Sequence, residues 1–435
     1  MKTPSRNSKK SKSTSSYKKP SIKKRPSNRG NDKKSLKSDG EVVLHPDSYK
    51  YLRKGHPWVT KDRYSLNFPK NFPLIYSLSN NQKWVFLNDP EHSKVKARLW
   101  TVLENSEESY STDNFWEDFS IRVSEAIEER IEEEIDNERE NFFLVFSEYD
   151  QIPGLKILKL KNIVLIEEYA NFWGHQKEQV KSILQKSLNH YFEEDITIIW
   201  TVRNTSKLKI KSSDQDLIDN EVVINEFGIS YKLNMKDFYD FGIYTDMSSI
   251  REGLSEHLYK ADSVLNLFCY TGAYSLYALG LEAKKVVSVD LSPKYLNWLQ
   301  ENLELNSHLE TKNHYSIKSD TLSAIKKLKK ENQKFSFIVC DPPSSFTDKN
   351  KRYSVLEYTE KLLPELFEVL TENGKIALFC NTHQTTRKKF KSVVNSLLPK
   401  NYAIQEELFL DGDCGALENF PESDYLKGFI ISKHP

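Results

Sequence analysis

Two residues in the carboxyl-terminal part of the chain have types and positions that suit covalent chemistry. Cys380 follows an apolar run, residues 376–379, that is typical of a buried strand, and the chain then becomes polar and basic. A cysteine thiolate is a strong nucleophile, whereas an uncharged cysteine at that position is a small core residue. Asp341 also ends an apolar run, in "FSFIVCDPPSSF". An acid followed by two prolines predicts a rigid turn that can hold a carboxylate, and the ring of Phe346, against a planar base.

A second pair of residues predicts a cofactor. Gly272 is the one glycine in "CYTGAYS", a loop between a predicted strand over 263–268 and a predicted helix over 273–281. Asp290 ends the next predicted strand, where a carboxylate can accept hydrogen bonds from both hydroxyls of a ribose. Nicotinamide dinucleotide and S-adenosylmethionine (SAM) both fit this arrangement. The loop lacks the G-x-G-x-x-G pattern that admits a diphosphate, and SAM has no phosphate, so we expect SAM.

These residues lie in a longer pattern of alternating strands and helices, from about residue 236 to residue 435. Such alternation predicts an α/β fold with a doubly wound sheet. The closing segments 402–410 and 426–433 predict a terminal antiparallel hairpin, which an all-parallel nucleotide-binding fold does not need. Together with the single-glycine loop and the acidic turn, the hairpin indicates a Rossmann-like class I methyltransferase domain.

The segment before this domain predicts a small β-barrel over residues 41–103. It contains three short strand-like stretches, "EVVLHP", "KWVFLNDP" and "KVKARLWTV". In "LRKGHPWV" basic residues flank Trp58, and this mixture suits phosphate binding and base stacking. A small barrel also buries a tryptophan in its core, so both interpretations of Trp58 stay open.

Residues 104–235 predict an α+β middle domain. Phe119, Val123 and Ile127 recur every four residues in "EDFSIRVSEAIEERIEEEIDNEREN", which predicts an amphipathic helix with an acidic solvated face. A second helix is expected over residues 174–192, with strand-like segments before and after it. No residues in this domain have catalytic spacing.

The charge of the chain is unevenly distributed. Residues 1–39 hold 14 Lys or Arg and two Asp, a charge of +12, so the remainder carries −11 within a total of +1. We expect residues 1–40 to be a disordered basic arm that binds a polyanion, with nucleic acid as the first choice. A solubilising tail, or a nuclear address built on "KKRP", is the alternative.

The cysteine pattern and hydropathy exclude other classes of protein. The four cysteines include no C-x-x-C pair, so no structural zinc site and no other metal site is expected. Free thiols are typical of a reducing compartment. No apolar run reaches the roughly 18 residues of a membrane span, and we predict a cytoplasmic protein.

The motifs resemble those of a known family. The segments "VLNLFCYTGAYS", "VVSVDLSPKYLNWLQENLELN" and "FIVCDPPSSF" are similar to the bacterial large-subunit ribosomal RNA methyltransferases. The closest group methylates cytosine C5 and joins an N-terminal PUA domain and a middle domain to the SAM fold. The likeness also includes "KARLWT", "SEYDQIPGLKI" and "DFYDFGIYTDMSSIR", and it extends over residues 41–435. It implies that residues 41–103 are a PUA-like RNA-binding domain and 236–435 the SAM-dependent methyltransferase domain.

The resemblance also implies roles for individual residues. The residues that it assigns to SAM are Phe268, Tyr270, Thr271, Gly272 and Asp290, with Asp320 of "IKSD" near the adenine and Asp341 at the site of methyl transfer. The residues expected to bind the RNA substrate are Pro342, Pro343, Phe346 and Arg251.

Cys380 matches the position of the nucleophile in the cytosine-C5 group. Carbon 5 of cytosine is weakly nucleophilic until a thiolate adds to carbon 6; carbon 5 can then attack the methyl group of SAM, a base removes its proton, and the thiol leaves. A cation such as Arg387 would favour the thiolate. The flanking residues Phe379 and Asn381 are more like a related guanine-N7 branch, which has serine in place of the cysteine and needs no covalent catalyst. Whether Cys380 attacks the base or only lines the pocket stays open.

The remaining candidates are weaker. Cys269 and Cys340 are expected to be small filler residues, and Cys414 lies in a loop from which it could approach the site. His383 could be a proton shuttle, although a lone histidine after a strand is more often a surface residue.

The sequence therefore predicts a SAM-dependent RNA methyltransferase that acts on C5 of a cytosine in large-subunit rRNA through a cysteine adduct. Guanine-N7 methylation on the same scaffold is the first alternative, and a non-catalytic RNA-binding assembly factor that retains a SAM fold is the second. RNA is the expected partner. No membrane contact is expected, and the oligomeric state is open, with a homodimer as one option.

Overall fold

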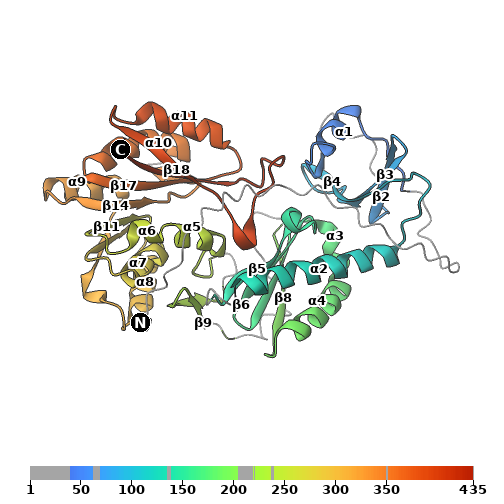
Figure 1. Cartoon of the computed structure of the whole chain (residues 1–435), viewed down its shortest axis with the longest axis horizontal. Coiled ribbons are helices and arrows are strands. Elements are labelled where there is room, and N and C mark those ends of the chain that lie inside the picture. The colour runs from blue at the N-terminus through green and yellow to red at the C-terminus, as the bar shows by residue number, and fades with distance from the viewer. Residues whose placement is uncertain are drawn as a thin grey trace. The chain divides into compact units, whose positions relative to one another are not determined.

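A computed structural model describes residues 40–61, 69–134, 139–203, 219, 221–236, 240–348 and 351–434 (Figure 1). The predicted basic arm lies outside the described residues up to residue 39. Residues 35–435 form one unit. In the described ranges no helix combines the length and the apolarity that crossing a bilayer requires.

The first described segment forms a four-stranded antiparallel sheet with the strand order β1-β4-β3-β2. The prediction of a strand in "EVVLHP" was wrong, because this segment makes isolated bridges, one of them from Glu41 to Tyr76, and then leads into a helix. Pro46 begins this helix, where its fixed φ is favourable and its missing N–H costs nothing. The elements are α1 (Pro46–Leu52), β1 (Trp58–Thr60), β2 (Leu74–Ser79), β3 (Gln82–Asn88) and β4 (Val95–Leu103).

The next segment confirms both helices that the sequence predicts before residue 235. The acidic helix buries Phe119, Val123 and Ile127 against a second sheet of strand order β5-β6-β7-β8. A separate hairpin, β9-β10, follows. The elements are α2 (Thr112–Glu134), β5 (Asn141–Phe146), β6 (Leu155–Leu160), β7 (Ile163–Glu168), α3 (Asn171–Gly174), α4 (Lys177–Tyr191), β8 (Thr197–Val202), β9 (Glu221–Glu226) and β10 (Ile229–Asn234).

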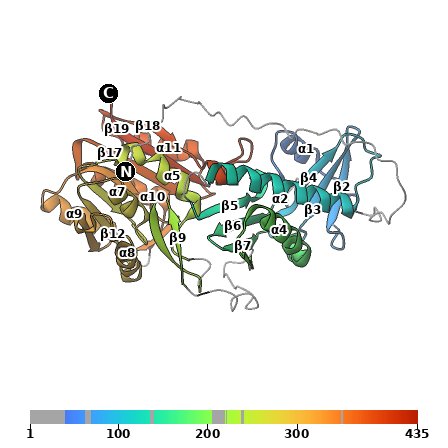
Figure 2. The ribbon, with the colours of Figure 1, turned by 60° about the horizontal axis from the view of Figure 1, so that its bottom comes forward.

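The carboxyl-terminal segment holds a seven-stranded sheet with the strand order β13-β12-β11-β14-β17-β19-β18. The first five of these strands are parallel. β19 is antiparallel to both of its neighbours, β17 and β18, which lie beside it in Figure 2. The predicted α/β class and the terminal antiparallel pairing are confirmed. The strands are β11 (Val264–Leu267), β12 (Val286–Asp290), β13 (His314–Lys318), β14 (Phe335–Cys340), β17 (Leu370–Asn381), β18 (Tyr402–Leu408) and β19 (Leu426–Lys433).

Helices cover both faces of this sheet, and Figure 1 shows α10 and α11 on the face opposite α7 and α8. One apolar cluster joins α7 and α8 to one face of the sheet, and another joins α9, α10 and α11 to the opposite face. A short hairpin, β15 (Ser345–Asp348) and β16 (Lys351–Ser354), was not predicted. The helices are α5 (Ser248–Gly253), α6 (Ser255–Leu258), α7 (Ala273–Gly280), α8 (Pro293–Leu305), α9 (Thr321–Lys330), α10 (Val355–Phe367) and α11 (Arg387–Leu397).

Side chains alternate between the two faces along each strand. On β17, Phe379 belongs to the cluster of α7 and α8, and Cys380 to the cluster of α9, α10 and α11. On β14, Cys340 lies on the same face as Cys380. Asp341 follows at the carboxyl end of β14.

Candidate active site

The loop between β11 and α7 has an unusual backbone. Phe268, Tyr270 and Gly272 have φ values of 58°, 51° and 90°, in the left-handed region that favours glycine. A Cβ atom added to Gly272 would lie 2.0 Å from Cδ1 of Leu299 on α8. The close approach of the loop to α8 therefore requires glycine at this position.

Asp290 fixes the other side of the loop. One carboxylate oxygen accepts a hydrogen bond from the Tyr270 backbone N–H at 3.0 Å, and the other accepts from the Ser292 N–H at 2.8 Å. Partial burial raises the pKa of Asp290, and these backbone donors oppose the rise. Each carboxylate oxygen retains acceptor capacity for a ligand. The turned loop and this carboxylate fit the sugar end of SAM.

Two further residues of the predicted SAM set have internal partners. Thr271 is fully buried, and its hydroxyl donates to the carbonyl oxygen of Gly242 at 2.6 Å. The Tyr270 hydroxyl donates to the Asp240 carboxylate. These side chains therefore shape the loop. Asp320 is exposed at the end of β13 and caps α9 by accepting from the Ser323 N–H at 2.9 Å.

Asp341 is the most strongly perturbed carboxyl group near the loop. Removal from water raises the pKa of Asp341 to about 7, the charge of Asp246 adds to the rise, and Arg251 opposes it. A carboxyl group with this pKa can both accept and release a proton at neutral pH. The hydroxyl of Tyr274, whose pKa Asp341 also influences, is buried without a hydrogen-bond partner among the described residues.

A group of residues lies around Asp246, whose charge acts on Asp341, and of its members the sequence singled out only Cys414 as a candidate. The Tyr425 hydroxyl donates to the Asp246 carboxylate, and the Cys414 sulfur lies 3.5 Å from the Asp246 carbonyl oxygen. Lys156 of β6 lies over the Phe146 ring, 3.7 Å from its centroid, and burial lowers the pKa of Lys156. The sequence signals for this group were Cys414, in a loop from which it could approach the site, and the presence of Asp246 in "DFYDFGIYTDMSSIR".

A buried cluster of charges holds the loop of Cys414 against α2 and β5. Arg139 binds both carboxylate oxygens of Asp413 at 3.4 and 3.3 Å, and the Phe143 N–H donates to Asp413 at 2.6 Å. Arg130 binds Asp150 at 2.7 and 2.8 Å and also donates to the Asp413 carbonyl oxygen. Residues from the middle of the chain thus position a loop close to Asp246.

Cys380 lies at the carboxyl end of β17, one strand beyond Asp341, where the sequence places it. Its side chain is fully buried. Burial raises the pKa of Cys380 to about 12, with Lys427 opposing the rise and Asp341 adding to it. The thiol of the free protein is therefore protonated at neutral pH.

Arg387, the cation expected to favour the thiolate, is bound elsewhere. Its guanidinium pairs with Asp424 at 2.8 and 3.1 Å and donates to the carbonyl oxygens of Leu408 and Leu426. Arg387 does not contribute to the pKa of Cys380, whereas Lys427 does.

The fold agrees with solved structures of other proteins. A Streptococcus mutans protein described provisionally as a SAM-dependent methyltransferase superimposes with a TM-score of 0.74 at 21% identity, covering 90% of this chain and 99% of that chain. A second protein, described provisionally as a methyltransferase and solved with SAH, gives a TM-score of 0.77 at 20% identity with the same coverage. The chain has the fold of these methyltransferases.

Sequence comparison finds relatives over nearly the whole chain. Ribosomal RNA large subunit methyltransferase I of Pseudoalteromonas atlantica is 26% identical over 403 residues, 89% of this chain and 98% of that protein. The protein of the same name from Aeromonas salmonicida is 25% identical over 402 residues, 90% of this chain and 98% of that protein. A family model described as "Conserved hypothetical protein 95" matches residues 247–397, within the methyltransferase fold.

The predicted substrate residues differ in their surroundings. Arg251 is fully buried and binds Glu226 at 2.7 and 2.9 Å. Arg251 was expected to bind the RNA substrate. Its guanidinium instead forms this internal ion pair, so the expectation is corrected to a structural role. Pro342 is buried and Pro343 is exposed. Phe346 lies on β15, and its side chain is outside the described part of the structure.

The remaining sequence candidates, Cys269, Cys340, His383 and Trp58, are buried or bound to other parts of the chain. Cys269 and Cys340 are buried, as expected for filler residues. His383 is exposed, and its Nδ1 donates to the Glu422 carbonyl oxygen at 2.9 Å. Trp58 packs on Phe420 with ring centroids 4.6 Å apart, and its indole N–H donates to Glu148 at 2.7 Å. These contacts favour the structural interpretation of Trp58.

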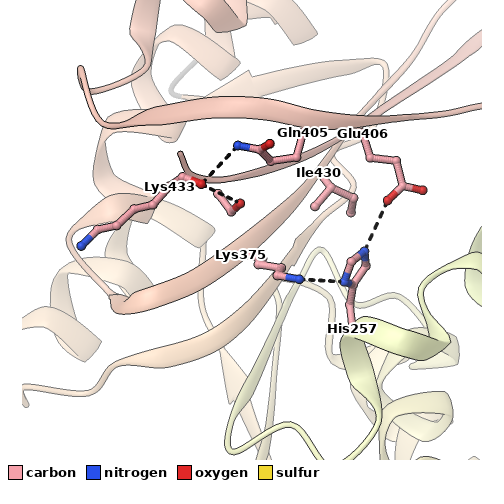
Figure 3. Close-up of a pocket in the computed structure, with 7 residues that line it drawn as sticks. His257, Lys375, Gln405, Glu406, Ile430 and Lys433 are labelled. Atoms are coloured by element: carbon pink, nitrogen blue, oxygen red, sulfur yellow. Dashed lines mark hydrogen bonds and ion pairs between the residues drawn. The ribbon is translucent and has the colours of Figure 1, made fainter. Parts of the chain in front are cut away.

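A pocket at the opposite end of the methyltransferase sheet contains none of the candidate residues (Figure 3). The Nζ atom of Lys375, on β17, lies 3.1 Å from Nδ1 of His257. The other ring nitrogen of His257, Nε2, lies 3.5 Å from a carboxylate oxygen of Glu406. These polar groups satisfy one another. The residues that line the pocket are His257, Lys375, Gln405, Glu406, Ile430, Ser432 and Lys433.

Proposed function

We propose that this protein is a SAM-dependent RNA methyltransferase that modifies C5 of a cytosine in large-subunit rRNA. The observation that carries the proposal is that Asp341 and Cys380 lie at the carboxyl ends of adjacent parallel strands, β14 and β17. This is the edge at which doubly wound sheets bind their ligands. The names of the two rRNA methyltransferase relatives support the choice of RNA as substrate.

In this proposal the loop 268–272 and Asp290 hold SAM. The positive φ angles turn the backbone of the loop towards the Asp290 carboxylate, which accepts from the Tyr270 N–H. Asp320, at the end of β13, would lie on the adenine side. Bound SAM supplies an electrophilic methyl group.

The chain's own residues would prepare the base for that methyl group. Cys380 would add to carbon 6 through its sulfur, and Asp341 would take the proton that leaves carbon 5. The pKa of Asp341, about 7, suits a group that must accept this proton and release it before the next cycle. Pro342 and Pro343 fix the backbone that follows Asp341.

RNA binding would use regions outside the methyltransferase fold. We assign residues 41–103 to a PUA-like RNA-binding domain, residues 104–235 to the middle domain and residues 236–435 to the SAM-dependent domain. The basic arm, residues 1–40, would add sequence-independent contacts to phosphates.

Guanine-N7 methylation is the second candidate, and the burial of Cys380 favours it. A fully buried thiol with a pKa of about 12 is not a nucleophile at rest. Guanine N7 has its own lone pair and needs no thiolate. The neighbours Phe379 and Asn381 also match the guanine-N7 branch.

Mass-spectrometric nucleoside analysis of rRNA distinguishes the two candidates. RNA from cells that lack the gene should lose one 5-methylcytidine, and expression of the full chain should restore it. Cys380→Ala should restore none of it while still binding SAM. Cys340→Ala, which removes a buried thiol from the adjacent strand on the same face, should restore it.

The opposite results would reject the cytosine assignment. Loss of 7-methylguanosine on deletion of the gene would establish the second candidate. Full restoration of 5-methylcytidine by Cys380→Ala would remove the covalent step.

A further inference from the structure

Strand β19 places a lysine directly opposite Cys380. The antiparallel register pairs Cys380 with Lys427 and Leu378 with Phe429. Leu378 and Phe429 belong to one apolar cluster, on the face of the sheet that also buries Cys380. Because side chains two residues apart share a face, Lys427 projects to the same face as Cys380. Opposed residues on one face of an antiparallel pair have Cβ atoms about 4.5–5.5 Å apart.

Lys427 is an unusual residue for this position because it is only 1% exposed. Its side-chain nitrogen donates to the carbonyl oxygen of Thr382 at 2.7 Å. This acceptor is neutral, and no carboxylate within the described ranges forms an ion pair with Lys427. A buried ammonium without an anion is costly. Burial therefore lowers the pKa of Lys427, which increases the fraction of neutral amine at a given pH.

Three other charged or titratable groups surround Lys427. The charge of Asp424 raises the pKa of Lys427, although two hydrogen bonds from Arg387 also hold this carboxylate. Arg387 opposes a second positive charge beside it. The pKa of His383 is lowered mainly by desolvation, and Lys427 contributes to this. Cys380 is the group directly opposite Lys427 on the same face of the sheet, and a thiolate there also raises the pKa of Lys427.

We propose that Lys427 takes the proton from the thiol of Cys380 and holds the resulting thiolate. The S–H bond breaks, the neutral amine gains the proton, and a thiolate remains beside an ammonium. The total charge of the pair does not change, so the pair forms without adding net charge to the buried site. The inference rests on the proposed function for its catalytic purpose, because only base attack at carbon 6 requires the thiolate.

Asp341, the other titratable neighbour of Cys380, has a different role. Its negative charge raises the pKa of Cys380 and so disfavours the thiolate. In the proposed function Asp341 takes the proton from carbon 5. If Asp341 had already taken the thiol proton, it could not accept this second proton. The two protons of the cycle thus go to two different residues. Lys427 acts through Cys380 and is a positioning residue in this scheme.

Titration of the Cys380 thiol in the free protein tests the proposal without RNA or SAM. The full chain is labelled with [3-13C]cysteine, and the Cys380 signal is identified as the one that Cys380→Ser removes. In Lys427→Gln, which keeps a donor for the Thr382 carbonyl, the titration midpoint should rise by at least one pH unit, a tenfold loss of thiolate at a given pH. Lys427→Arg keeps the charge and should leave a lower midpoint than Lys427→Gln.

Lys433→Gln is the matched control. It removes the same charge from the same strand, where Lys433 pairs with Glu372 at 3.3 Å at the opposite end of the sheet. It should not move the Cys380 midpoint. Equal midpoints in Lys427→Gln and Lys433→Gln would overturn the proposal.

A second measurement serves if Lys427→Gln does not fold. Coupling of two titrating groups is reciprocal, so Cys380→Ser should shift the titration of the 15N-labelled Lys427 side chain. An unchanged Lys427 titration would overturn the proposal. Nucleoside analysis can independently reject cytosine methylation, and the titrations would still decide whether Lys427 controls the thiol.

Discussion

Asp341 carries a proton whose binding depends on pH in the neutral range. Its pKa rises from 3.8 in an exposed aspartate to about 7 in the fold. Between pH 4 and pH 7 the folded state holds the Asp341 proton and the unfolded state does not. The free energy of unfolding is therefore highest below pH 4, and it decreases as the pH rises through 7. Asp341→Asn removes this dependence.

The expected result for Asp341→Asn is a gain in stability that grows with pH. Relative to the original protein, the free energy of unfolding should increase by about 3 kcal/mol more at pH 8 than at pH 4.5. Denaturant unfolding at the two pH values measures the difference. The same change at both pH values would mean that the Asp341 carboxyl is ionised throughout. Methyl transfer should be lost in this variant.

Single residues were predictable where their function follows from local sequence. Gly272, Asp290 and Asp341 each stand at the end of an apolar run beside a turn, and parallel strands bring their ends to one edge. Lys427 and Asp246 have no such signal. Lys427 stands beside Cys380 only because β19 inserts between β17 and β18 in one register, and no local pattern specifies that register.

At the scale of elements, the entry to α7 depends on Gly272. An alanine at this position would combine an unfavourable φ of 90° with a Cβ contact of 2.0 Å to Leu299. Gly272→Ala should move α8 or the loop, lower SAM affinity at least tenfold and reduce the melting temperature. Calorimetry with SAM and thermal unfolding measure these effects.

Gly228→Ala is the matched control, because it isolates the cost of a left-handed backbone from that of the Leu299 contact. Gly228 has a similar φ of 78°, and a Cβ there would meet nothing within 4 Å. It should cost about 1 kcal/mol of unfolding free energy from its left-handed backbone alone and leave SAM affinity unchanged. Equal effects of both substitutions on SAM binding would show that the Leu299 contact does not matter.

Elements with a strong period or a buried apolar run were predictable, and irregular ones were not. The helices α2 and α4 and the strands β11, β12, β14 and β17 lie where their patterns place them. The bridge at Glu41 and the hairpin β15-β16 were missed. In both places pairing with a distant segment or a short turn decides the structure, and residue propensity is a weak guide.

At the scale of the whole molecule, charge separates the amino-terminal arm from the rest of the chain. An arm of +12 beside a body of −11 should bind RNA through counterion release, while the body contributes specificity. Deletion of residues 1–39 should make the plot of log affinity against log salt less steep, by about 0.7–0.9 for each phosphate that the arm neutralises in the full chain. Binding to an rRNA fragment at several salt concentrations measures the slope.

A full-length variant whose 14 arm cations are replaced by serine controls for the length of the arm. It should match the deletion. An unchanged slope in both variants would exclude the arm from RNA binding.

Contacts between distant parts of the chain were not predictable. The ion pair of Arg139 with Asp413 and the ring contact of Trp58 with Phe420 join residues more than 270 positions apart. Each single residue looks like a surface charge or a stacking ring until its partner is known. This explains why Trp58 could be assigned to RNA or to packing with equal justification.

The position of β19 also determines when the seven-stranded sheet can close during synthesis. Ribosomes make β19 after every other strand of the sheet. Before that moment β17 has an unpaired edge, which is a template for aggregation, and β18 has no neighbour in the sheet. The strand that closes the sheet is also the strand that brings Lys427 to Cys380. A nascent chain that stops before Leu426 therefore lacks both the strand that closes the sheet and the lysine opposite Cys380, so we expect incomplete products to depend on chaperones and to transfer no methyl group.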